Sequence, residues 1–195
     1  MLVHWTESDL LVDGVQIHYY RTGNGDKPPL LLIHGFSDNG LCWTPTAREL
    51  EADYDVIMPD MRGHGRSQRV QPDDDVDMAA DVAGLIRALG LTRPIMVGHS
   101  MGAMVTYQVG VRFPELVSAL VLEDPPWWLT PPGGSQPPSP PEENPVAVWA
   151  RSLAHQTLEE LLEQNRRDHP LWPEELIQPM SEAKKQLDQT IVDIM

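Results

Sequence analysis

The sequence has little that would cross-link it, anchor it in a membrane or attract it to nucleic acid. Its single cysteine, Cys42, excludes an internal disulfide and a CxxC metal pattern, and favours a reducing, cytoplasmic compartment. No stretch approaches the roughly 18 consecutive apolar residues of a membrane span, and the N-terminal residues show no signal peptide. Only 14 lysines and arginines stand against 29 aspartates and glutamates, and the net charge of −15 argues against nucleic acid and anionic membranes as partners.

What is present suits a soluble globular protein, because 41% of the 195 residues are hydrophobic. An Asp13-Gly14 pair between two strand-like runs predicts an N-terminal hairpin. Four apolar runs are typical of buried strands, and they alternate with three helical patterns. The strands are expected at 30–33, 55–58, 94–97 and 116–122, and the helices at 44–52, 78–89 and 101–113. Thr44 is the expected N-cap of the first helix. This alternation predicts an α/β fold with a mostly parallel sheet.

The chain divides into three parts by composition. Residues 1–128 carry the alternating strands and helices and form the predicted core. Nine of the nineteen prolines fall between Pro125 and Pro145, so residues 129–145 are predicted to be a proline-rich excursion. Residues 146–195 contain helix-like stretches and no convincing strand, which indicates a helical cap or lid over one end of the sheet.

Two motifs bring nucleophile and oxyanion chemistry together. Gly98-His99-Ser100-Met101-Gly102 is a G-x-S-x-G between a predicted strand and a predicted helix, the context of a nucleophile elbow. Ser100 is the candidate nucleophile, and Met101 supplies a backbone N–H to the oxyanion hole. The second motif is His34-Gly35-Phe36, which follows the strand expected at 30–33 and which we call the oxyanion loop. Its Phe36 is placed to give the second N–H. His34 either fixes this loop by hydrogen bonding or contacts the substrate as part of the pocket.

Two further polar segments favour structural roles. Residues 60–67, Asp60-Met61-Arg62-Gly63-His64-Gly65-Arg66-Ser67, predict an ordered loop beside the oxyanion loop. The acidic run 73–75 suits the positive end of the helix that follows better than a metal site. No metal and no other cofactor is expected.

In order and spacing, these motifs resemble the α/β-hydrolase fold superfamily, in its lidded branch of small esterase-like enzymes. The resemblance covers residues 10–128 firmly and the cap-like tail more loosely. Similar enzymes with aspartate at the nucleophile position dehalogenate or open epoxides, whereas Ser100 implies acyl transfer through an acyl-enzyme. The resemblance therefore implies a carboxylesterase-like hydrolase (EC 3.1.1) acting on a small-molecule acyl substrate.

The resemblance also implies parts that the sequence lacks. In the family, the triad acid usually follows the seventh strand and the histidine the eighth, but only six strands are predicted here. Two strand–helix units, on the order of 60 residues, are expected to be missing. Asp124 is a candidate triad acid or a structural carboxylate, since some relatives place the acid after the sixth strand. Trp127 is expected to line the pocket mouth or to pack under the cap.

Three hypotheses remain open at this stage. The first is an incomplete serine hydrolase whose general-base histidine comes from residues outside this sequence, with His155 and His169 as weaker candidates. The second is a non-catalytic protein of the same fold that binds a small molecule. The third is completion of the sheet by self-association or domain exchange through its open edge. The identity of the substrate does not follow from the sequence.

Overall fold

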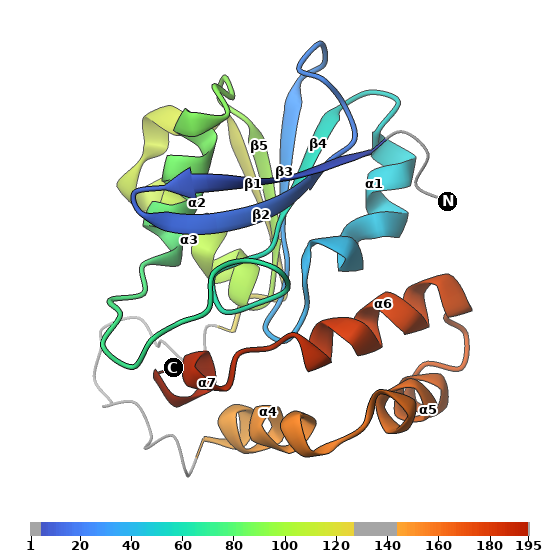
Figure 1. The fold of residues 1–195 in the computed structure, drawn as a ribbon. Helices are drawn as coiled ribbons and strands as arrows, with labels where there is room; N and C mark the ends of the chain where they lie inside the picture. Colours follow the sequence, from blue (N-terminus) through green and yellow to red (C-terminus); the bar gives the residue numbers. More distant parts are fainter. Residues whose placement is uncertain (1–4, 127–143, 195) are drawn as a thin grey trace.

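The computed structural model describes residues 5–126 and 144–194, which contain a six-stranded sheet with helices on both faces (Figure 1). The strand order is β1-β2-β4-β3-β5-β6. β1 and β2 form the predicted antiparallel hairpin, and β2 pairs antiparallel with β4, while the other pairs are parallel. The predicted α/β fold is therefore confirmed. The strands are β1 Thr6–Val12, β2 Val15–Arg21, β3 Pro29–Ile33, β4 Asp55–Pro59, β5 Ile95–His99 and β6 Ala119–Glu123.

Alternating residues of the central strands build a core on each face of the sheet. Leu31 and Ile33 of β3 pack with α2 and α3 on one face, whereas Leu30 and Leu32 pack with α1 on the other. All four side chains are almost fully buried, as period-two alternation requires in a sheet that is covered on both sides. The helices are α1 Thr44–Leu50, α2 Met78–Ala88 and α3 Met101–Arg112, with short 3-10 turns η1 Gly40–Trp43 and η2 Pro114–Leu116.

Four helices form the cap, at the end of the sheet where β3, β4 and β5 terminate (Figure 1). They bury their own apolar cluster, which Val70 of the core joins. Asp188 fastens the cap to the core, because its carboxylate accepts from Val70 N (2.8 Å) and its N–H donates to Gly63 O (2.8 Å). The cap helices are α4 Pro145–His155, α5 Leu158–Asp168, α6 Glu174–Lys185 and α7 Gln189–Ile194.

The structure corrects several predicted boundaries. Thr44 is the first residue of α1 rather than its N-cap, because η1 precedes it and its hydroxyl donates to Leu41 O (2.6 Å). Asp77, not the acidic run 73–75, caps α2 by accepting from Ala80 N (3.0 Å). The last strand begins only at Ala119, after the η2 turn.

The cap also differs in detail from its prediction. The helix-like stretches predicted within residues 146–195 are four helices, and the part from Glu174 onward is divided into α6 and α7. Pro145 already belongs to α4, whereas Trp127 and residues 129–143 of the predicted excursion lie outside the described residues. Within the described ranges, no helix is long and apolar enough to cross a membrane.

Candidate active site at the strand ends

The turn between β5 and α3 holds Ser100 in a conformation that side chains rarely adopt. Its φ is 52° and its ψ is −115°, outside the regions that suit a residue with a Cβ atom. A Cβ on Gly98 would collide with Gly102 O, and a Cβ on Gly102 would collide with Ile33 O, so both flanking glycines are required by close backbone approach. The turn therefore presents a partly buried serine hydroxyl beyond the end of the sheet.

The two predicted N–H donors lie on neighbouring strand ends. β3 and β5 are paired with Ile33 opposite Gly98, so the segments that follow them leave the sheet side by side. Met101 is the first residue of α3, and the first N–H groups of a helix have no partner inside the helix. Among the described residues, neither Met101 N–H nor Phe36 N–H has a hydrogen-bond acceptor. Both donors are therefore free for an incoming oxygen.

His34 fixes the peptide that carries the Phe36 N–H. Met61 N donates to His34 Nε2 (2.9 Å), so the ring proton is on Nδ1 and is donated to Gly35 O (2.8 Å). Asp38 N donates to the same carbonyl (3.2 Å). Because C=O and N–H point in opposite directions in a trans peptide, this arrangement turns the Phe36 N–H away from His34. The predicted loop-fixing contact of His34 is present, and the ring also lines a pocket described below.

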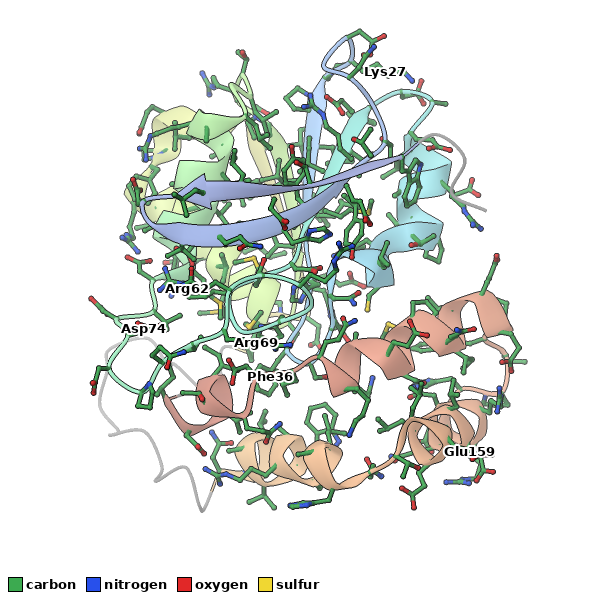
Figure 2. All side chains as sticks on the ribbon, in the orientation of Figure 1. Lys27, Phe36, Arg62, Arg69, Asp74 and Glu159 are labelled. Carbon is green, nitrogen blue, oxygen red and sulfur yellow. The ribbon has the colours of Figure 1, made fainter. Side chains whose placement is uncertain are left out.

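Burial keeps the two histidines under the oxyanion loop neutral. Burial lowers the pKa of His34 to about 3 and that of His64 to about 4. The His64 ring packs edge-on against the Phe36 ring, with 5.6 Å between centroids, and its Nδ1 is 3.1 Å from Arg62 O. Neither ring has the exposure of a proton carrier, so both hold the loop in place. Figure 2 shows Phe36 between the sheet and the cap, in agreement with its packing against both apolar clusters.

The loop at residues 60–67 is ordered, as predicted, and is tied to the oxyanion loop. Asp60 is buried, and its carboxylate accepts from Gly40 N (2.7 Å) and Arg66 N (2.8 Å). Ser67 Oγ donates to Asp60 O (2.6 Å). Arg62 forms an ion pair with Asp81 of α2 (2.5 Å), and its Nη1 donates to Asp75 O (3.3 Å), near Asp74 in Figure 2. The loop thus connects β4, α2 and η1 without contributing a side chain to the serine.

Asp124 follows β6 next to the elbow, but no histidine partner for it is described. Ser100 N donates to Glu123 O (2.9 Å), so Asp124 and Ser100 leave adjacent strands at the same edge. The Asp124 side chain is exposed, and its φ is 45°. Within residues 5–126 and 144–194, no histidine ring forms a hydrogen bond with Ser100 or Asp124. His155 and His169 lie at the C-terminal ends of α4 and α5 in the cap.

Two cavities lie at this end of the sheet. The larger, about 570 Å³, is bounded by Met101 and Met104 of α3, by the loop before α2 and by α7. The smaller, about 300 Å³, lies between the oxyanion loop and α6 and includes His34, Asp38 and His99 in its wall. Asp38, which lies two residues after Phe36, has no predicted role, because nothing in the local sequence marks a carboxylate that the fold leaves without a donor.

The protein belongs to the alpha/beta hydrolase fold family, whose model matches residues 28–175. Among curated proteins, Epoxide hydrolase 4 of Mus musculus is 30% identical over 112 residues, or 56% of this chain and 31% of that protein. An uncharacterised protein of Mycobacterium tuberculosis is 37% identical over 110 residues, or 54% of this chain and 32% of its own length. The chain thus spans about a third of the length of these curated relatives.

Solved structures agree on the fold. The N-formylmaleamic acid deformylase of Pseudomonas putida S16, in a serine-to-alanine variant, is similar over 96% of this chain and 71% of its own, with a TM-score of 0.74 and 26% identity. Epoxide Hydrolase A of Mycobacterium thermoresistibile is similar over 60% of this chain and 38% of its own, with a TM-score of 0.55 and 28% identity. These relatives support a hydrolase in general terms.

Proposed function

We propose that the protein is a serine hydrolase that cleaves a carboxylic ester or a related acyl compound through an acyl-enzyme. The observation that carries the proposal is Ser100, held at φ 52° in the turn between β5 and α3. Its hydroxyl oxygen adds to the carbonyl carbon, the acyl–oxygen bond breaks, and the leaving alcohol takes up a proton. Water then releases the acid and restores the serine.

The oxyanion of each step is bound by the Phe36 and Met101 N–H groups. Both lack acceptors among the described residues, and the Gly35 carbonyl is held by two donors, so the donors need no rearrangement during reaction. Asp124 is the proposed triad acid. The general-base histidine is assigned to a part of the protein outside the described residues, in keeping with the short share of the relatives' length that this chain spans.

Serine at the elbow is the reason for preferring acyl transfer to epoxide opening. Several relatives are named epoxide hydrolases, but the resemblance links epoxide opening to an aspartate at the nucleophile position, where this chain has Ser100. A serine alkoxide and two oxyanion donors suit a trigonal carbonyl that becomes tetrahedral. The alternative is a protein that keeps the pocket and binds a small molecule without turnover.

The test is to react the chain with a fluorophosphonate probe and a p-nitrophenyl short-chain ester. We expect covalent labelling at Ser100, read by mass spectrometry of peptides, and ester turnover that exceeds the reaction in water by the roughly 10³–10⁴-fold that remains when one triad member is missing. Ser100→Ala must abolish labelling, whereas Ser118→Ala, at the opposite end of the sheet, must not.

Other outcomes assign a different function. Absence of labelling together with tight small-molecule binding supports the non-catalytic alternative, and hydrolysis of styrene oxide without ester turnover supports epoxide opening. Ester turnover that is fast and lost in His155→Ala or His169→Ala places the base in the cap.

A further inference from the structure

The smaller cavity, of about 300 Å³, has a wall that the proposed chemistry at Ser100 does not use. We call it the Asp38 pocket; it lies between the oxyanion loop, η1, the ends of β5 and β6, and helix α6. Its polar and aromatic wall includes Asp38, Trp43, His99, Glu123 and Trp172. No lysine or arginine is among its described lining residues, whereas two carboxylates are.

Asp38 is a largely buried carboxylate without a donor. Among the described residues, no N–H or O–H group donates to its side chain. The positive charge of Lys184 on α6 lowers the pKa of Asp38 from a distance, but the two side chains form no ion pair. The Lys184 ammonium instead donates to Met180 O (3.3 Å). Burial raises the pKa of Asp38 to about 6. A buried carboxylate left unpaired is costly, so its partner is expected to be a ligand.

The rest of the wall indicates what that ligand carries. Trp43 and Trp172 give the pocket aromatic surface, and the Trp172 ring is stacked on His169 at 3.7 Å between centroids. A carboxylate and the faces of indole rings together attract a cation.

The pocket adjoins the proposed oxyanion hole through Gly35. A Cβ on Gly35 would lie 2.7 Å from His99 Nδ1 and 3.1 Å from Asp38 Oδ2, so these side chains converge over the residue that precedes Phe36. His99 in turn precedes Ser100. The pocket wall therefore includes the residues that directly precede Phe36 and Ser100.

We propose that the Asp38 pocket binds a primary ammonium group, and that the substrates are esters or related acyl compounds bearing such a group near the carbonyl. The Asp38 carboxylate accepts from the ammonium, which lies beside the aromatic rings of Trp43 and Trp172. Asp38 is a specificity-determining residue in this assignment. The substrate class rests on the proposed function, whereas ammonium binding does not.

Binding is measured by calorimetry on the whole chain carrying Ser100→Ala, with n-butylammonium chloride, n-butanol and sodium butyrate as probes. We expect n-butylammonium to bind at least about tenfold more tightly than the other two, as a charge-assisted hydrogen bond implies. Asp38→Asn, of the same shape, should remove about tenfold in n-butylammonium affinity and abolish the preference over n-butanol. Glu123→Gln, which removes the exposed carboxylate of the wall, should cost less than about threefold.

Equal affinity for n-butylammonium and n-butanol, or unchanged ammonium affinity in Asp38→Asn, overturns the proposal. Asp38→Ala provides a second variant if Asp38→Asn does not fold. It should likewise lose about tenfold in n-butylammonium affinity and abolish the preference over n-butanol.

A substrate comparison separates this proposal from the proposed function. The p-nitrophenyl ester of 4-aminobutyrate should show a kcat/KM about tenfold above that of p-nitrophenyl valerate, with the difference lost in Asp38→Asn. Ammonium binding without Ser100 labelling contradicts the proposed function and leaves the pocket standing. Ser100 labelling without ammonium preference overturns only the pocket.

Discussion

At the scale of single residues, Asp38 is a carboxylate whose environment opposes its charge. The carboxylate is largely buried, receives no hydrogen bond from described groups, and has its pKa raised to about 6 from 3.8. The titratable groups around it are those of His34, Cys42, His99, Glu123 and Lys184. Binding residues commonly carry such a cost in stability, because the fold keeps them ready for a ligand.

This cost predicts that Asp38→Asn stabilises the protein in a pH-dependent way. Because the folded pKa is raised, the protonated form suits the fold, and wild-type stability falls as pH rises between about 3.8 and 6. The variant should be more stable by about 3 kcal/mol at pH 8 and by about half of that at pH 5. Urea unfolding at both pH values measures the difference.

Glu123→Gln serves as the control, since this carboxylate is exposed and its removal should change stability by less than about 0.5 kcal/mol at either pH. A loss of stability in Asp38→Asn at pH 8 would show that the carboxylate is a structural partner after all.

At the scale of elements, the turn from β5 to α3 stores strain at Ser100. A residue with a Cβ at φ 52° and ψ −115° costs about 1–3 kcal/mol, which glycine avoids. We therefore expect Ser100→Gly to be more stable than Ser100→Ala by about 1 kcal/mol, although both lose the nucleophile. Thermal and urea unfolding of the two variants measure this difference.

Ser118 provides the matched pair, because it is exposed and is not among the residues with positive φ. At that position, the Ser118→Ala variant should be more stable than the Ser118→Gly variant by about 0.5 kcal/mol. The same order at both positions would mean that the elbow is not strained.

Elements whose signals are local were predictable, and contacts between distant segments were not. The Asp13-Gly14 hairpin and the strand–turn–helix around Ser100 depend on neighbouring residues, and the structure confirms both. The start of β6 was misplaced because residues 116–118 are as compatible with a turn as with a strand. The Asp38 pocket joins the oxyanion loop to Trp172 of the cap, so neither its shape nor the isolation of its carboxylate follows from any local pattern.

At the scale of the whole molecule, the sheet ends on one side at β6, which pairs with β5 alone among the described strands. Leu120 faces α3, where it fills the space beside Gly110. Its neighbours Ala119 and Val121 therefore lie on the opposite face, and Val121 is 50% exposed. A strand edge with an exposed apolar face is a site for pairing with another strand. We therefore expect two copies of this chain to associate through β6.

Val121→Lys should weaken this association, because a lysine on an edge strand must stay in water when a second strand adds. The dimer dissociation constant from sedimentation equilibrium should rise about fivefold, or ~1 kcal/mol. Leu11→Lys tests the opposite edge: Leu11 of β1 is 71% exposed, and its replacement should leave the constant unchanged. An equal effect of the two substitutions would mean that added positive charge, rather than the β6 edge, governs association of a chain whose net charge is −15.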